Sequence, residues 1–287
     1  PHEESRLAGL LASFAGGRNC DAAALTELRG LRDRYGTPPS LREALLQAFA
    51  ACEEQEATAE LLAATLSPTP STDERLQLGA AWLRASRYEE ATEILLPLAQ
   101  EQGPGTKAAW LAGFALFHAG RSGEALPWLE GARDQVGGGN VTDAPLLIGL
   151  SLLHQGQVDR AITELEAGRD AAPEDRSILS ALARAYATAG RGEDAEQASA
   201  RVRELNQTNA AQELQMARLS ALSSALKTAQ AEGHNDDADR IIEEMLPMAP
   251  AQTRPKLLEL RARLYDEDGR TEDAAAVRQQ IATGGTP

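Results

Sequence analysis

The sequence predicts an all-α fold, a solenoid of stacked helix–turn–helix repeats. Alanines recur along the 287 residues at intervals of 34, 34, 34, 36, 34, 43 and 36. Self-similarity at this period is typical of supersecondary units that pack on their neighbours. Aromatic residues make up only 4% of the chain, and its many Ala and Leu residues suit closely packed helices better than strands. The recurrent alanines are Ala23, Ala57, Ala91, Ala125, Ala161, Ala195, Ala238 and Ala274.

A glycine precedes the alanine by five residues in five of the eight repeats and predicts the turn. Each glycine follows an apolar-periodic stretch, where a helix end favours a left-handed residue. Acidic residues come next, as in Gly190-Arg-Gly-Glu-Asp-Ala195, and they suit the positive N-terminus of a second helix. We therefore expect a helix, a tight turn and a second helix in each repeat. The glycines are Gly120, Gly156, Gly190, Gly233 and Gly269.

The alanine lies where the two helices of a hairpin approach most closely, so a larger side chain there would cost about 1–3 kcal/mol. The first helices carry a small or leucine site at Leu11, Leu45, Gly79, Gly113, Gly149, Ala183, Leu226 and Ala262. Three residues later follow Phe14, Ala48, Trp82, Leu116, Leu152, Tyr186, Ala229 and Tyr265. In the second helices Leu61, Leu95, Leu129, Leu165 and Ile242 are predicted to point inward, and Glu27, Ser199 and Arg278 depart from this rule. Pro173 and Pro250 are predicted to end their repeats.

These positions, as in Leu78-Gly79…Trp82…Ala91…Leu95, resemble the tetratricopeptide repeat. The resemblance covers most of the chain in about eight units, which start near residues 4, 38, 72, 106, 142, 176, 209 and 255. It implies a right-handed superhelix whose first helices line a concave groove that binds a peptide or protein. We expect a single solenoid over 1–287, with degenerate repeats in 1–71, well-formed repeats in 72–208 and C-terminal repeats in 209–287.

The 43-residue interval between Ala195 and Ala238 is the irregular one. The stretch from Asn209 to Glu232 holds no Pro or Gly and follows Thr208, a residue type that caps helices. We predict a first helix extended by about two turns that starts after Thr208. The alternative is a short extra helix with a break near Arg218. Loops are predicted at 137–140 and 67–70.

Charge and composition bear on the partners. The net charge of −15 argues against non-specific binding of nucleic acid and against attraction to anionic lipid. No apolar run approaches the length of a membrane span. Three lysines against 25 arginines favour a GC-rich, bacterial genome. The chain starts at Pro1 without Met, so we expect a processed form or a part of a longer chain. The sequence does not distinguish bacterial cytoplasm from periplasm.

Cys20 and Cys52 are the two cysteines, and neither has metal-ligand spacing. They fall near equivalent turns of neighbouring repeats, so a disulfide is the alternative. We interpret them as isolated thiols.

The groove candidates of the central repeats are apolar. Trp110, Phe114 and Phe117 are spaced i, i+4, i+7 on one stripe of a helix, beside His118. The next repeat offers Leu146, Leu150, Leu153 and His154. We interpret them as a pocket for a partner's helix or extended segment. The alternative is that they thicken the core between neighbouring repeats.

Other groove candidates are basic, namely Arg184, Lys227 and Arg263, with Arg84 on the other side. Such a lining would attract an acidic peptide or a carboxylate. Alternatively, these arginines pair with neighbouring Glu and cover apolar surface with their stems. Chaperone-binding relatives hold carboxylates with Lys, Arg and Asn. That clamp is not expected here, because the first helices lack Asn at groove-facing positions.

No motif for catalysis or a cofactor occurs: there is no phosphate loop, nucleophile motif or HExxH. His118 and His154 lack a further ligand of suitable spacing for a metal, and residues 235–239 lack the twelve-residue calcium loop. We therefore predict a non-catalytic scaffold for a protein or peptide partner. The alternatives are a self-assembling unit that forms homo-oligomers, and an accessory region of a larger enzyme or of an envelope secretion or polysaccharide-export machine.

Overall fold

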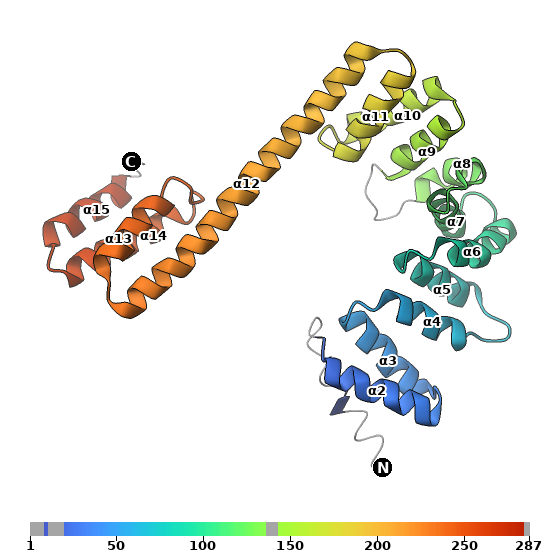
Figure 1. Ribbon diagram of the computed structural model, residues 1–287, viewed down its shortest axis with the longest axis horizontal. Helices are drawn as coiled ribbons and strands as arrows, with labels where there is room; N and C mark the ends of the chain where they lie inside the picture. The colour runs from blue at the N-terminus through green and yellow to red at the C-terminus, as the bar shows by residue number, and fades with distance from the viewer. Residues whose placement is uncertain (1–8, 11–19, 136–142, 284–287) are drawn as a thin grey trace. The chain divides into compact units, whose positions relative to one another are not determined.

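The structure, a computed structural model, describes residues 9–10, 20–135 and 143–283 (Figure 1). All regular elements in these ranges are helices, which confirms the all-α fold. The chain divides into two compact units, Pro1–Arg201 and Val202–Pro287. Each unit is described by itself. None of the helices in the described ranges is both long and apolar enough to cross a bilayer.

The first unit is a row of α-hairpins that stack in chain order (Figure 1). The hairpins α3–α4, α5–α6, α7–α8, α9–α10 and α11–α12 match the repeats expected from residues 38, 72, 106, 142 and 176. Its helices are α2 (Ala22–Tyr35), α3 (Pro39–Ala51), α4 (Gln55–Ala64), α5 (Thr72–Arg84), α6 (Tyr88–Gln102), α7 (Lys107–His118), α8 (Ser122–Gly131), η1 (Arg133–Gln135), α9 (Asp143–His154), α10 (Val158–Ala171), α11 (Arg176–Thr188) and the start of α12 (Gly192–Glu232).

The first helices of the hairpins form the inner layer of this unit. Helices α5, α7, α9 and α11 contact one another in that order. Within the described residues, the second helices α6, α8 and α10 approach one another less closely. A row of hairpins curves toward the layer in which neighbours lie closer. The face of the first helices is therefore the concave side of the unit.

The turns inside the hairpins share one hydrogen-bonding pattern. After α7, the N–H of Arg121 donates to the carbonyl of Leu116 at 2.8 Å, and after α11 the N–H of Arg191 donates to Tyr186 at 2.8 Å. Such a bond closes a helix end in which one residue is left-handed. All five predicted turn glycines have positive φ, which confirms their role. Glu53 and Ser86 take the same conformation without being glycine, at φ of 56° and 58°.

The predicted small-residue packing is confirmed at five of the eight recurrent alanines, whereas Ala57 and Ala195 are half-buried. Five of the recurrent alanines, Ala91, Ala125, Ala161, Ala238 and Ala274, are fully buried. A Cβ placed on Gly79, Gly113 or Gly149 would lie within 2.9 Å of the leucine that faces it. Those leucines are Leu95, Leu129 and Leu165, all predicted to point inward.

The first repeat departs from the predicted register by one residue. Ala23 is exposed, whereas Ala24 and Leu28 are buried. Asp21 caps α2, so this helix starts one residue before Ala23, while α6 starts three residues before its alanine. The later start rotates the inward face by one position. The departure at Glu27 was the sequence signal for this shift. Leu11 and Phe14 lie outside the described residues, as does the predicted loop at 137–140.

The prediction that a helix starts after Thr208 is wrong. α12 is continuous over 41 residues, and there is no break at Arg218. The Thr208 hydroxyl donates to the carbonyl of Glu204 at 3.0 Å, one turn back in the same helix. No Pro or Gly occurs between Gly192 and Gly233, so nothing stops the second helix of one repeat from continuing into the first helix of the next.

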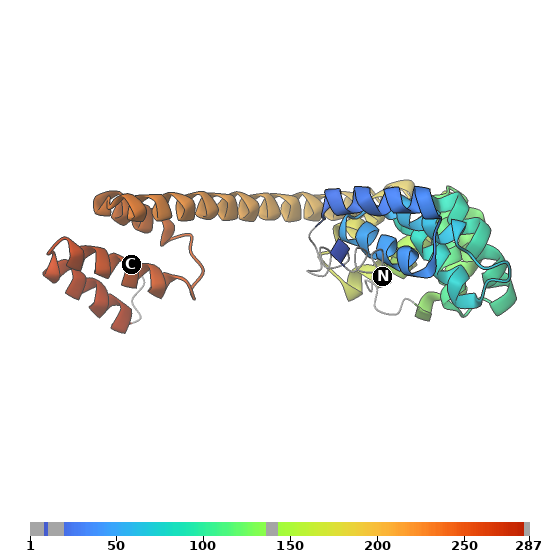
Figure 2. The ribbon, with the colours of Figure 1, turned by 90° about the horizontal axis from the view of Figure 1, so that it is seen from below.

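The second unit holds the rest of α12 with α13 (Asn235–Met245), α14 (Arg254–Glu267) and α15 (Thr271–Thr283). α14 and α15 lie side by side (Figure 2). The core gathers side chains from all four helices, among them Leu226, Ile242 and Leu258. Beside it, the Asp239 carboxylate accepts from the Tyr265 hydroxyl at 2.9 Å and from Arg261 Nε at 2.5 Å.

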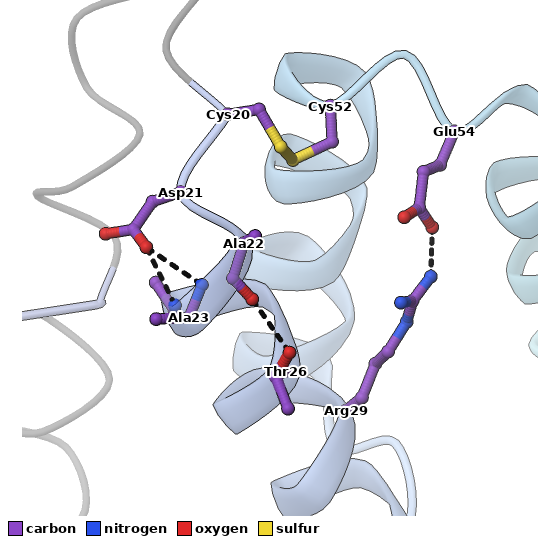
Figure 3. The surroundings of a disulfide bond; sticks show 9 residues. Cys20, Asp21, Ala22, Ala23, Thr26, Arg29, Cys52 and Glu54 are labelled. Carbon is purple, nitrogen blue, oxygen red and sulfur yellow. Dashed lines mark hydrogen bonds and ion pairs between the residues drawn. A yellow bond between two sulfur atoms is a disulfide. The ribbon is translucent and has the colours of Figure 1, made fainter.

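The interpretation of the cysteines as isolated thiols is wrong. Cys20 and Cys52 form a disulfide, with their Cα atoms 4.6 Å apart (Figure 3). Stacking places equivalent turns of neighbouring repeats side by side, so the residue that precedes the α2 cap lies beside the residue that follows α3. In the same corner Asp21 accepts from the N–H groups of Ala23 and Ala24 at 3.1 and 3.0 Å.

Candidate protein-binding face

The inner layer of the first unit carries a set of half-buried apolar side chains, here called the apolar strip. On each helix they are three or four residues apart, so they lie on one side of it. They pack against the core with one part of the side chain and leave the other part uncovered. The apolar strip consists of Leu111, Phe114 and Phe117 on α7 and Leu146, Leu150 and Leu153 on α9.

Trp110 is placed differently from Phe114 and Phe117. It is 8% exposed and belongs to the hydrophobic core. Helix α7 contacts α5, α6, α8 and α9, so most of its circumference is enclosed. Trp110 lies on the enclosed part of the helix. It therefore packs in the core between neighbouring repeats and does not line a pocket. Phe114 and Phe117 fall on the part that faces the inner side.

His118 ends α7 inside a group of aromatic rings. The centroid of its imidazole lies 4.4 Å from that of Phe114, 5.3 Å from that of Phe117 and 5.0 Å from that of Tyr88, whose ring stacks on it at 22°. One edge of the imidazole remains exposed. Its partial withdrawal from water lowers the pKa of His118 below the ordinary 6.5, because burial disfavours the charged form. The ring is therefore neutral at pH 7 and stacks as an apolar group.

His154 occupies the equivalent end of α9. Its ring lies parallel to that of Phe117, with the centroids 6.1 Å apart. Its Nδ1 is 2.8 Å from the hydroxyl oxygen of Ser122, at the start of α8. The two histidines thus join the ends of neighbouring repeats and close one end of the apolar strip. In the part of the chain that the structure describes, no three His, Cys, Asp or Glu side chains are grouped for a metal.

A second feature of the same unit is a hollow of about 490 Å³, here called the basic hollow. It is lined by Leu46 of α3, Leu62 of α4, Leu76, Ala80, Asp73, Gln77 and Arg84 of α5, and Lys107 of α7. Its apolar lining is formed by the three leucines and the alanine, and Arg84 and Lys107 bring positive charge. Among the described residues, neither of these cations forms an ion pair within 4.0 Å.

Arg84 was a predicted groove residue, whereas sequence reasoning missed Lys107. The signal was present, because Lys107 lies one 34-residue period after Asp73 and so takes the same place on its helix. A cation in the first turn of a helix is opposed by the helix dipole. Lys107 therefore stabilises α7 less than an acidic residue would, which is consistent with another role.

The remaining predicted basic residues are exposed and lie in both units. Arg184 is exposed on α11 of the first unit. Lys227 on α12 and Arg263 on α14 are exposed in the second unit. Arg263 pairs with Glu259, one turn earlier, at 3.6 Å. Arg263 therefore matches the alternative interpretation, in which an arginine forms an ion pair with a neighbouring glutamate instead of binding a partner.

The comparisons with known proteins agree with this architecture. The family model of the tetratricopeptide repeat matches residues 152–219, and the hairpins of the first unit repeat that pattern from residue 38 onward. Residues 152–219 thus match the tetratricopeptide repeat, and the hairpins before them have the same helical architecture. Proteins built from these repeats are interaction scaffolds. None of the curated proteins compared with this chain matches it.

Solved structures show the same fold. The chain is similar to MamA from MSR-1, with 18% identity and a TM-score of 0.50 over 62% of this chain and 99% of that one. It is also similar to a MamA RS-1 double mutant, with 19% identity and a TM-score of 0.51 over 59% and 94% of the two chains. YrrB, described as a TPR protein with an unusual peptide-binding site, has 15% identity and a TM-score of 0.47 over 65% and 93%.

Proposed function

We propose that this protein is a non-catalytic scaffold and that the inner face of its first unit binds a segment of a partner protein. The observation that carries the proposal is the apolar strip. Six large apolar side chains from two neighbouring first helices lie half-exposed on the concave side. A contiguous set of this kind marks an interaction surface, whereas single exposed apolar residues need no explanation.

The apolar strip supplies the affinity in this proposal. Burying apolar surface contributes roughly 25 cal/mol per Å², and aromatic anchors near the centre of an interface dominate the binding energy. Phe114 and Phe117 are such anchors, flanked by Leu150 and Leu153 and closed at one end by His118 and His154. Trp110 supports them from the core. The occupant is a helical or extended segment with apolar side chains at matching intervals.

In this proposal the basic hollow determines which charge the partner segment carries. Arg84 and Lys107 lie beside an apolar lining and form no ion pair within the described chain. With Asp73 in the same lining, the hollow carries two cations and one carboxylate, so in a chain with a net charge of −15 it is a net positive site that attracts a carboxylate. The proposed ligand therefore has an acidic group close to an aliphatic side chain, and Arg184 on α11 is a further contact for acidic residues.

The test uses a peptide library selected for binding to the full chain. We expect the selected peptides to be apolar with at least one acidic residue. Phe114→Ala and Phe117→Ala should each weaken their binding about tenfold or more, because each removes an aromatic anchor. Leu96→Ala is the matched control, since Leu96 is a half-buried side chain of a second helix. Dissociation constants are measured by fluorescence anisotropy.

A second pair of variants tests the basic hollow. Arg84→Glu with Lys107→Glu should weaken acidic peptides and reduce the salt dependence of their binding. Lys256→Glu is the control. Lys256 is an exposed residue of α14 in the second unit, and its substitution reverses one positive charge outside the hollow. The proposal fails if the selected peptides bind the phenylalanine variants as tightly as the unchanged chain, or if they protect the second helices from hydrogen exchange instead of α7 and α9.

A further inference from the structure

The disulfide ties α2 to α3 in the first unit. Cys20 directly precedes Asp21, the cap of α2, and Cys52 directly follows α3 (Figure 3). The bond therefore joins the start of one helix to the end of its neighbour. Cys20 is exposed and Cys52 is half-buried, so an external thiol reaches the bond from the Cys20 side.

The core of these helices is separate from the core of the central repeats. Ten buried residues of α2, α3 and α4 form one cluster, whereas nineteen from α6 to α10 form another. Among the described residues this cluster is the smaller of the two, and small separate cores open at lower cost than the whole unit. A covalent tie between two helices of such a core adds to its stability.

The polar contacts across the same corner are weak. Arg29 of α2 pairs with Glu54 in the turn after α3, and the two side chains are 41% and 30% exposed. Ion pairs this open to solvent contribute little and are screened by salt. The guanidinium of Arg29 also lies 5.5 Å from the ring centroid of Phe49. None of these contacts replaces the disulfide as the tie between the start of α2 and the end of α3.

We propose that the Cys20–Cys52 bond is a reversible covalent lock on α2 and α3. In the oxidised protein α2 and α3 stay docked on each other. In the reduced protein they open locally, while α7 and α9 with the apolar strip remain folded. Disulfides persist in oxidising compartments and are reduced in the cytosol, so the state of the lock depends on where the protein is.

The lock closes by thiol–disulfide exchange with a disulfide donor. The thiolate of one cysteine attacks the donor and forms a mixed disulfide, which releases the first donor thiolate. The thiolate of the other cysteine then attacks the cysteine sulfur of the mixed disulfide and releases the second. Two electrons pass to the donor, and the two protons of the cysteines end on the two donor thiols. A dithiol reductant reverses both steps.

The lock also acts on the basic hollow. α3 provides Leu46 to its lining, whereas the apolar strip lies on α7 and α9. Opening of α2 and α3 removes one wall of the hollow and leaves the strip intact. This consequence, unlike the lock itself, rests on the proposed function.

Hydrogen exchange on the full chain tests the lock without any ligand, so its outcome is independent of the binding proposal. The protein is equilibrated with oxidised glutathione or with dithiothreitol, and thiol alkylation with mass spectrometry reports the bond. We expect the amides of α2 and α3 to exchange about tenfold faster or more after reduction, with α7 and α9 unchanged. Cys20→Ser with Cys52→Ser should behave like the reduced protein under both conditions.

Three results would overturn the lock. Two free thiols after treatment with oxidised glutathione would show that the bond does not form. Unchanged exchange in α2 and α3, with the bond shown to be reduced, would make it dispensable. Equal acceleration in α7 and α9 would mean that reduction unfolds the whole unit. The chain without substitutions, compared in its oxidised and reduced forms, tests all three results. The test therefore does not depend on whether the double serine variant folds.

Discussion

At the scale of single residues, an arginine in the turn covers an aromatic ring in three repeats. The guanidinium lies 4.2 to 5.6 Å from the ring centroid of the residue five positions earlier. The same arginine pairs with an acidic residue three positions later. An exposed cation–π contact is worth about 0.5–1 kcal/mol. The three sets are Trp82, Arg87 and Glu90; Tyr186, Arg191 and Asp194; and Tyr265, Arg270 and Asp273.

This arrangement changes the meaning of the acidic residues after each turn. By their place in the sequence, these residues suit the positive end of the second helix. The structure adds that they hold the arginine over the ring of the first helix. The aromatic and the arginine were both visible in the sequence, but the five-residue step between them was not recognised as a contact, because it spans the turn.

The glycines of the first helices lead to a stability prediction. A Cβ added to Gly149 would lie 2.6 Å from Cγ of the fully buried Leu165. Gly149→Ala should therefore lower the free energy of unfolding by about 1–3 kcal/mol, measured by urea denaturation. Gly123→Ala is the control, because a Cβ there meets no atom within 4 Å, and it should be neutral or slightly stabilising. Equal stability of the two variants would contradict the close approach of the hairpin helices.

At the scale of elements, α12 differs from the other second helices in its length. A second helix such as α10 has 14 residues, whereas α12 has 41. The exposed side of α11, the partner of α12 in its hairpin, is polar at Ser177, Ser180, Arg184 and Thr188. A polar outer face is what the last repeat of an array requires in water. The hairpin α11–α12 is therefore suited to end this row of hairpins.

A proline at Asn209 distinguishes the continuous helix from a helix that starts after Thr208. Proline is tolerated at the first position of a helix, but inside one it removes a hydrogen bond and clashes, at a cost of about 3 kcal/mol. Asn209→Pro should therefore lower the helical signal in circular dichroism and speed amide exchange around residue 209. Asn209→Ala should do neither. A proline variant indistinguishable from the alanine variant would mean that a helix starts at this residue.

At the scale of the whole molecule, the chain holds two compact units with separate cores. The cluster that contains Ile242 consists of residues from α12 to α15, all within Val202–Pro287. The clusters of α2 to α11 lie within Pro1–Arg201, up to Ala198 at the start of α12. In linear arrays stability is a sum of local terms. The two units are therefore expected to respond separately to mutation.

Ile242→Ala tests this independence. Ile242 is fully buried, so its truncation should cost about 2–5 kcal/mol in the second unit. Amides of α13, α14 and α15 should exchange faster, while those of α7 and α9 keep their rates. Leu129→Ala, a fully buried residue of α8, should show the opposite pattern. Faster exchange of α7 and α9 in the Ile242 variant would show that the units unfold together.

Much of the fold could be predicted because its signals are local and repeated. The turn glycines, the buried alanines and the leucines that face glycines recur at one period, so each repeat supports the assignment of the others. The candidate site could be predicted only in part. Phe114, Phe117, His118 and His154 lie next to one another, whereas Trp110, on the same stripe, is in the core. Helical spacing does not show how far the neighbouring helices wrap around α7.

By itself the sequence determined that this protein is an array of α-hairpins, because small side chains and turn residues act within one hairpin and need no distant partner. Only the tertiary structure decided the disulfide, the continuity of α12 and the lining of the basic hollow. Each of these depends on residues that stacking brings together from different repeats, or on whether a helix end is capped or continued. The repeat period can place such residues near one another, but it does not show which of them make contact.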